Sequence, residues 1–379
     1  MQCFVILISD QTMPNLTFLS YVLDKQNCEF DLILLTTKLM QEQKKVESIL
    51  MALDYKGKYK EILIESENLQ NNIKILDSNI EKNENVEYIV NITCGNKIMF
   101  LSVYLWFSGL TNALIYYLPI NSNAFTLIYP IDREESFIPE YLDSIELILK
   151  SYNIDIKSVS DPLFDYNIAL NFYLMYKEKI SSKHKKAFLM LRNIYHSKNI
   201  KIKYNEGEFE YPDEIVAELN KIEIDKEEIN KIFECIFEGN TPKKISTAYI
   251  DYISGGWFEE YIYYNLKQTN PQDIMLNVKA TNLLNNEFDV FMLKNNVLYF
   301  IECKTSVNSP NGNIINETLY KLDSLSHPAG LTVKKFLICL DEKIFEKEFV
   351  KIRAKQTRIQ IVTGSKLNPE IIKQELMRL

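Results

Sequence analysis

The sequence has few histidines and cysteines and no long apolar run. It contains three histidines and six cysteines in 379 residues, and no two cysteines form a C-x-x-C pair. This argues against a histidine-rich metal centre, a zinc site or a disulfide framework, and it suits a reducing cytoplasm. No apolar run reaches the roughly 18–20 residues that span a bilayer. Residues 1–11 have no basic lead-in and no small-residue cleavage site, so we interpret them as a first strand and not as a signal peptide.

Positive charge is also scarce over most of the chain. The formal net charge is −8, and by segment residues 1–150 carry −8, residues 151–240 carry −3 and residues 241–379 carry +3. This distribution argues against a basic nucleic-acid-binding surface over the whole protein. It predicts that a polyanionic substrate is handled by the C-terminal part.

The composition and length are those of a globular protein with two or three domains, since 46% of the residues are hydrophobic and 25% are charged.

Strands and helices are predicted to alternate over residues 1–150, which we interpret as the first domain. The predicted strands are 3–9, 30–36, 61–64, 86–92, 113–118 and 124–129, and helices are predicted after residue 15 and over 39–53, 69–82 and 97–107. This order predicts an open α/β sheet with right-handed crossovers, in which ligands bind beyond the carboxyl ends of the strands.

Residues 151–240 are predicted to form a helical connector, and residues 241–379 a second α/β domain. Helical spacing is seen over 167–180 and 183–192, and residues 212–237 are charged and amphipathic. The last domain is predicted as a helix over 256–267, strands over 273–281, 286–293 and 297–304, a helix over 315–326, a strand over 334–341, a helix over 343–354 and a strand over 358–362.

Two carboxylates and an ammonium interrupt the apolar hairpin of this last domain. Asp289 lies on one predicted strand, and Glu302 and Lys304 share a face of the next strand because side chains alternate along a strand. Converging carboxylates repel each other unless a divalent cation lies between them, and hard oxygen ligands suit Mg²⁺ or Mn²⁺. The spacing therefore predicts a metal site formed by Asp289 and Glu302 that acts on phosphate. Lys304 would either position or deprotonate a water, or counter phosphate charge.

The arrangement resembles the core of PD-(D/E)xK nucleases, a restriction-endonuclease-like fold. In that core a helix carrying a glutamate comes first, and the motif GGWFEEYIY at 255–263 stands in this place. The resemblance implies Glu259, or else its neighbour Glu260, as the helical catalytic carboxylate, and Glu259 fits the pattern better. It implies catalytic roles for Asp289, Glu302 and Lys304. The sequence departs from the family in that Phe288, and not proline, precedes the aspartate.

Several neighbouring side chains have alternative interpretations. Glu287 could substitute for Asp289 or assist it. Tyr320 and Lys321 either reach toward substrate or serve packing and the surface. Tyr261, Tyr263 and Tyr264 either stack on bases or pack in the core.

Two loops at predicted strand ends of the first domain carry polar residues suited to a small anion. The candidate ligand-binding residues are Ser9, Gln11, Thr12 and Asn15 in the first loop, and Thr93, Cys94, Gly95, Asn96 and Lys97 in the second. Backbone N–H groups at a helix N-terminus favour anions, and glycine allows close approach of a ligand. Neither GxGxxG nor a Walker A motif is present, so a dinucleotide or NTP-hydrolysis site is not predicted.

Both loops resemble those of CARF domains, the Rossmann-like sensors of cyclic oligoadenylates in type III CRISPR systems. The order of CARF sensor, helical connector and nuclease with GGWFEEY resembles the single-CARF nucleases activated by cyclic tetra-adenylate. The second loop departs from the family's G-G-[ST]-K at Cys94 and Asn96 and matches it at Gly95 and Lys97. The resemblance implies a cytoplasmic homodimer that binds cyclic tetra-adenylate. It implies a Mn²⁺- or Mg²⁺-dependent endonuclease of antiviral defence, cutting single-stranded DNA or RNA or nicking supercoiled DNA.

Two other functions compete with this one. A constitutive restriction-like endonuclease would use the first domain to bind DNA, which the −8 charge of that domain opposes. A non-enzymatic ligand-sensing regulator would carry a degenerate nuclease domain, which the presence of Asp289, Glu302 and Lys304 together opposes.

Overall fold

The computed structural model describes most of the chain outside the middle segment. The described residues are 1–25, 30–120, 122–177, 204–205, 208–210, 244–246, 248, 251–281, 287–305, 314–330, 332–346, 348–364, 367, 370, 372 and 374. The helices predicted over 183–192 and 212–237 lie outside them.

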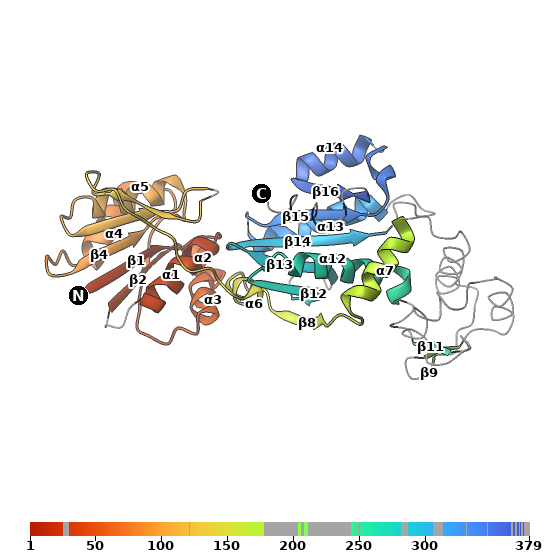
Figure 1. Cartoon of the computed structure of the whole chain (residues 1–379). Helices are drawn as coiled ribbons and strands as arrows, with labels where there is room; N and C mark the ends of the chain where they lie inside the picture. Colours follow the sequence, from red (N-terminus) through yellow and green to blue (C-terminus); the bar gives the residue numbers. More distant parts are fainter. Residues whose placement is uncertain are drawn as a thin grey trace, which may run out of the picture.

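The first domain is a seven-stranded sheet with the order β3-β2-β1-β4-β5-β6-β7 (Figure 1). Its strands are β1 (Gln2–Leu7), β2 (Phe30–Thr36), β3 (Lys60–Leu63), β4 (Glu87–Asn91), β5 (Ala113–Tyr117), β6 (Phe125–Tyr129) and β7 (Ser136–Phe137). Strands β1 to β5 are parallel, and β6 and β7 pair antiparallel at one edge. Its helices are α1 (Met13–Lys25), α2 (Lys38–Glu42), α3 (Lys45–Ala52), α4 (Leu69–Asn79) and α5 (Lys97–Phe107). The predicted open α/β sheet is thus confirmed.

Strand β1 lies at the centre of this domain because its side chains are apolar on both faces. Phe4 and Ile6 enter one buried cluster, and Val5 and Leu7 enter another on the opposite face. A strand covered on both faces reads as a continuous apolar run, which is why it was recognisable in the sequence.

The second large sheet has six strands in the order β16-β15-β14-β13-β12-β8. Its strands are β8 (Ile156–Ser160), β12 (Asp273–Ala280), β13 (Glu287–Lys294), β14 (Val297–Lys304), β15 (Lys334–Cys339) and β16 (Ile359–Thr363). Antiparallel pairing joins β8, β12, β13 and β14, and parallel pairing joins β14, β15 and β16. Its helices are α7 (Tyr166–Lys177), α12 (Trp257–Lys267), α13 (Ile314–Ser326) and α14 (Glu348–Thr357). Short helical turns occupy η1 (Tyr252–Gly256), η2 (His327–Ala329) and η3 (Glu342–Glu346). Strands β9 (Tyr204–Asn205), β10 (Glu208–Glu210) and β11 (Lys244–Ser246) form a separate three-stranded sheet.

Part of the predicted connector belongs to this second sheet. Strand β8 pairs with β12, and α7 packs on α12 through stacked rings, Tyr173 on Tyr261 with centroids 4.3 Å apart. The sequence I-K-S-V-S of β8 carries only two apolar residues, and most of the strand is exposed. Its edge position therefore left no strong strand pattern in the sequence.

Helix α6 (Ile145–Ser151) lies between the two domains (Figure 1). At its start, the backbone N–H of Ile145 donates to Asp273 of the second domain at 2.9 Å. At its end, the hydroxyls of Ser151 and Thr12 are hydrogen-bonded at 2.8 Å, which ties the helix to the first domain. None of the described helices is long and apolar enough to cross a membrane.

Candidate active site and sensor loops

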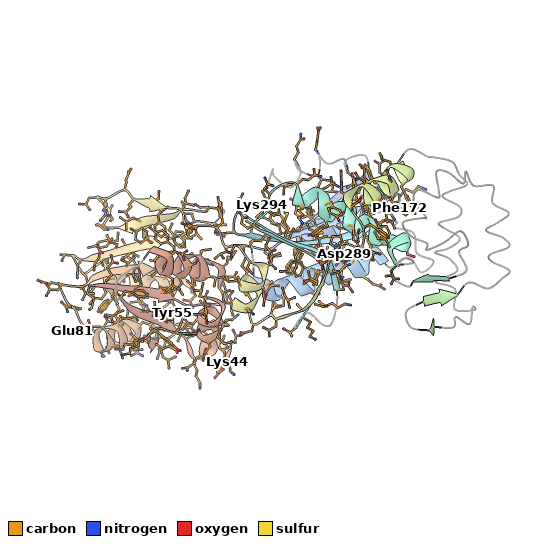
Figure 2. The ribbon with its side chains drawn as sticks, turned by 60° about the horizontal axis from the view of Figure 1, so that its bottom comes forward. Lys44, Tyr55, Glu81, Phe172, Asp289 and Lys294 are labelled. Carbon is orange, nitrogen blue, oxygen red and sulfur yellow. The ribbon has the colours of Figure 1, made fainter. Side chains whose placement is uncertain are left out.

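The β13–β14 hairpin brings the three motif residues together. Asn295 and Asn296 form its turn with φ of 52° and 60°, the left-handed backbone that two-residue hairpin loops require. The turn fixes the pairing so that the backbone N–H of Cys303 donates to Asp289 Oδ2 at 2.6 Å. Figure 2 shows Asp289 inside the second domain, away from Lys294 at the hairpin end that faces the first domain.

Asp289 and Glu302 converge on one ammonium group. Lys304 Nζ lies 3.3 Å from Asp289 Oδ2 and 3.3 Å from Glu302 Oε2. Asp289 is 8% exposed and Glu302 is 1% exposed, so water screens these charges weakly. Burial alone would lower the pKa of Lys304, but the surrounding carboxylates raise it above its usual value. Lys304 is therefore an ammonium at neutral pH.

The structure brings Glu259, and not Glu260, to this cluster. Removal from water, followed by the charge of Asp289, raises the pKa of the Glu259 carboxyl to about 8. Burial likewise raises the pKa of Glu302 to about 7, with Asp289 contributing next. Glu260 points elsewhere: its carboxylate accepts the backbone N–H groups of Leu163 and Phe164, the latter at 3.3 Å, and so anchors the segment before α7.

Lys321 on α13 reaches the same carboxylate from another element. Its Nζ lies 2.6 Å from Glu302 Oε1 and also donates to the backbone carbonyl of Glu287. The Glu287 carboxylate itself is paired with Lys279 at 3.0 Å. Tyr320 is 52% exposed, and the Arg353 guanidinium lies over its ring, with Cζ 3.2 Å from the ring centroid.

The tyrosines of α12 pack within the domain. Tyr261 is fully buried and its hydroxyl donates to the Leu367 carbonyl at 3.1 Å, while Tyr263 is 8% exposed. Tyr264 donates to the Phe164 carbonyl at 2.6 Å. Packing and hydrogen bonding thus account for these side chains, as one of the two interpretations expected.

Asp289 and Glu302 supply the oxygen donors of this cluster that a metal ion could use. Among the described residues no three histidine, cysteine, aspartate or glutamate side chains form a metal-binding group. Mg²⁺ is commonly held by one or two carboxylates together with waters and substrate phosphates. The carboxylates of Asp289 and Glu302 already converge on a single cation, the Lys304 ammonium, and both offer hard oxygen donors. The residues therefore fit a divalent cation.

Two of the four predicted polar side chains of the first loop, residues 9–15, are buried. Thr12 and Asn15 are fully buried; Thr12 contacts Ser151, and the Asn15 amide donates to the Leu7 carbonyl at 3.1 Å. Ser9 and Gln11 are partly exposed. The loop thus uses two of its four predicted residues to fix its own shape and presents the other two at its surface.

The second loop packs against the first loop, and its residues 95–97 are exposed to solvent. Cys94 is buried and its Sγ lies 3.2 Å from the Gln11 carbonyl, while the Thr93 hydroxyl accepts from the Leu118 N–H at 2.9 Å. Asn96 is the N-cap of α5. Gly95 has φ of 85°, and a Cβ there would collide with the side chain of Leu7. Gly95, Asn96 and Lys97 are exposed at the carboxyl edge of the sheet.

Lys45 is a neighbour of the first loop that the sequence did not single out. It begins α3 as a buried residue; its ammonium lies 3.9 Å from Asp10 Oδ1 and over the Tyr152 ring at 5.6 Å. Burial lowers the pKa of Lys45, and the charge of Asp10 partly opposes this. A buried lysine in an otherwise ordinary K-K-V-E segment gives no sequence signal, because only the tertiary structure buries it.

Two family models match separate parts of the chain. Residues 3–146 match the Card1 CARF domain family, and residues 247–377 match the Card1-like endonuclease domain family. A search of curated proteins found no match.

Solved structures share the fold along the whole chain. Can2 from Sulfobacillus thermosulfidooxidans, in complex with cyclic tetra-adenylate, is 19% identical with a TM-score of 0.68, covering 100% of this chain and 99% of that one. Protein VC1899 from Vibrio cholerae is 18% identical with a TM-score of 0.73, covering 100% and 97%. A type III CRISPR defence DNA nuclease activated by cyclic oligoadenylate is 15% identical with a TM-score of 0.50, covering 89% and 45%. At these identities the likeness shows the fold alone.

Proposed function

We propose that this chain is an endonuclease activated by a cyclic oligoadenylate. The proposal starts from its family, because both of its domains place it with the single-CARF nucleases of the Card1 type. The observation that carries the proposal is the buried cluster in which Asp289 and Glu302 share the Lys304 ammonium. A degenerate domain would have no physical reason to keep two desolvated carboxylates at this position. The proposed role is in type III CRISPR antiviral defence.

The residues of the cluster have distinct proposed roles. Asp289 and Glu302 would hold a Mg²⁺ or Mn²⁺ ion, and such an ion would supply Lewis-acid polarisation of the scissile phosphate and of a water. Glu259 contributes a third carboxyl group beside them. Lys304, whose ammonium lies beside both carboxylates, stabilises the negative charge that develops on the phosphate.

The proposed substrates are single-stranded DNA and RNA, and supercoiled DNA that is nicked. The C-terminal domain is the positive part of the chain, with +3 over residues 241–379. A weakly positive domain suits transient contact with one strand better than tight binding of a long duplex.

The proposed activator is cyclic tetra-adenylate, bound at the two sensor loops. Ser9, Gln11, Gly95, Asn96 and Lys97 lie at the carboxyl edge of the parallel strands, where such sheets bind ligands. Lys97 supplies a positive charge for phosphate. Because the ring has near two-fold symmetry, two copies of the loops in a homodimer would grip it. The activator acts through its preference for the active arrangement.

The test is a cleavage assay on fluorescent single-stranded DNA, single-stranded RNA and supercoiled plasmid. It is run with and without Mn²⁺ or Mg²⁺, and with and without cyclic tetra-adenylate. The Glu302→Gln variant is compared with Glu348→Gln, which changes an exposed glutamate of α14 that pairs with Lys351. We expect cleavage only with both metal and ring, lost in Glu302→Gln and kept in Glu348→Gln.

Two results would contradict the proposal. Equal cleavage with and without the tri-, tetra- or hexa-adenylate rings would indicate a constitutive nuclease. No cleavage of any substrate under all these conditions would indicate a sensing regulator.

A further inference from the structure

The Glu302 carboxylate has a separate lysine on each of its oxygens. Lys304, from the same strand, lies 3.3 Å from Oε2, and Lys321, from α13, lies 2.6 Å from Oε1. Only Lys304 also contacts Asp289. The two oxygens of one side chain therefore face different partners, and Oε2 is the oxygen on the Asp289 side.

The ammonium of Lys321 is fixed by more than this ion pair. It donates to the backbone carbonyl of Glu287 and lies 5.1 Å from the centroid of the Phe288 ring. These contacts join α13 to the first residues of β13, just before Asp289. Lysine is a compact charge on a flexible stem, and these two contacts restrict that stem so that its ammonium lies at Glu302 Oε1.

The pair is also removed from water. The side chain of Glu302 is 1% exposed and that of Lys321 is 22% exposed. Surface ion pairs contribute little, whereas removal of one partner of a buried pair leaves an uncompensated charge. A lysine with only a surface role would have no reason to contact the strand that carries the nuclease motif. Lys321 extends from α13 and makes that contact.

We propose that Lys321 is a positioning residue of the nuclease site, which holds Glu302 Oε1 so that Oε2 stays on the Asp289 side, where the two carboxylates would hold a divalent cation. This inference rests on the proposed function and adds a residue of α13 to the site. Partners that orient metal-ligating carboxylates typically change metal affinity or activity by 10- to 100-fold when they are removed. Lys321 is 19 residues beyond Glu302 in the chain and lies outside the D…E-x-K pattern.

The experiment compares Lys321→Met, Lys321→Arg and Lys335→Met in the full chain. Lys335 offers a matched control, because it pairs at 2.8 Å with Asp323 of the same helix α13. Methionine keeps the length of the side chain and removes the charge, and arginine keeps the charge. Binding of Mn²⁺ alone is measured by electron paramagnetic resonance without nucleic acid, and kcat and KM are measured for strand cleavage.

We expect Lys321→Met to weaken Mn²⁺ binding and lower kcat by about 10- to 100-fold. Lys321→Arg should recover most of both, and Lys335→Met should leave both close to the wild type. Unchanged Mn²⁺ binding and unchanged kcat in a folded Lys321→Met protein would overturn the proposal, as would equal losses in Lys335→Met. If the wild type binds Mn²⁺ but cuts no nucleic acid, the proposed function fails while the binding comparison still decides the role of Lys321.

Discussion

Glu259 and Glu260 are adjacent on α12 but have different surroundings. Glu259 faces the charges of Asp289, Lys304 and Glu302, whereas Glu260 accepts backbone N–H groups from the segment before α7. Consecutive residues of a helix point about 100° apart, so only one of the two can reach a given site. The pair therefore allows a matched test of function against structure.

We expect Glu259→Gln to abolish most cleavage while the protein stays folded. Glu260→Gln should do the opposite: glutamine has one acceptor oxygen where the carboxyl group has two, so one of two backbone N–H groups loses its partner at a cost of about 1–3 kcal/mol of stability, while kcat stays largely unchanged. Cleavage rates and melting temperatures of the two variants are the measurements. A larger loss of kcat in Glu260→Gln would show that the assignment is reversed.

The raised pKa of Glu259 predicts a pH dependence of stability. The pKa of about 8 in the folded protein lies above the ordinary value of 4.5. The protonated carboxyl is favoured in the fold, so its contribution is fully present below about pH 4.5 and is lost as the pH rises toward 8. In metal-free buffer, Glu259→Gln should therefore raise the melting temperature more at pH 8 than at pH 5. Thermal unfolding with EDTA checks this, and an equal gain at both pH values would contradict it.

At the scale of elements, α6 is bonded to both domains. At its N-terminal end, the backbone N–H of Ile145 donates a hydrogen bond to Asp273. The Leu142 N–H, just before the helix, donates to Asn296 in the β13–β14 turn at 2.8 Å. At its C-terminal end the Ser151 carbonyl accepts from the Ser48 hydroxyl at 3.0 Å. Because this short helix is held at both ends, we expect it to transmit displacements between the domains.

Tyr152, directly after α6, contacts both domains. Its hydroxyl accepts from the Met13 N–H at 3.4 Å, and Gly330, with φ of 105°, leaves the space for this hydroxyl because a Cβ there would collide with it. The residue thus joins the first sensor loop to the segment after α13. This makes it the best-placed single side chain to test coupling between the sensor and the nuclease.

Tyr152→Phe removes only that hydroxyl. We expect the affinity for cyclic tetra-adenylate to stay within about threefold, and the ratio of cleavage rates with and without the ring to fall by about 3- to 30-fold, the usual range for residues that couple two sites. The control is Tyr55→Phe, which removes a sensor-domain hydroxyl that donates to the Lys58 carbonyl at 2.9 Å. An unchanged activation ratio in Tyr152→Phe would show that coupling follows another route.

At the scale of the whole molecule, the proposed function requires an exposed loop edge to bind a ring larger than a mononucleotide. Each chain offers one set of loops, and the side chains of Thr12, Asn15 and Cys94 are already used inside the domain. A ring with near two-fold symmetry would satisfy its contacts with two copies of the remaining surface.

We expect about one ring to bind per two chains, and the protein to sediment at twice the mass of one chain. Isothermal titration calorimetry and analytical ultracentrifugation measure the two quantities. Lys97→Ala should weaken ring binding by about 10-fold or more, as a charge-assisted contact to phosphate is lost. Lys56→Ala, at an exposed lysine paired with Asp54, should bind normally. One ring per chain with a monomeric mass would contradict the two-copy site.

Features that depend on neighbours along the chain could be predicted from the sequence. The apolar run of β1 predicted a central strand, because burial on both faces needs apolar residues at every position. The spacing of Asp289, Glu302 and Lys304 predicted their convergence, because a tight turn fixes hairpin register and strands alternate their faces. The tertiary structure was needed for the rest: the place of β8 in the second sheet, the contacts of Glu260 with the segment before α7, and the approach of Lys321 to Glu302. It also paired Thr12 with Ser151, 139 residues apart. Such contacts depend on how whole elements pack, and no local pattern of residue types encodes that packing.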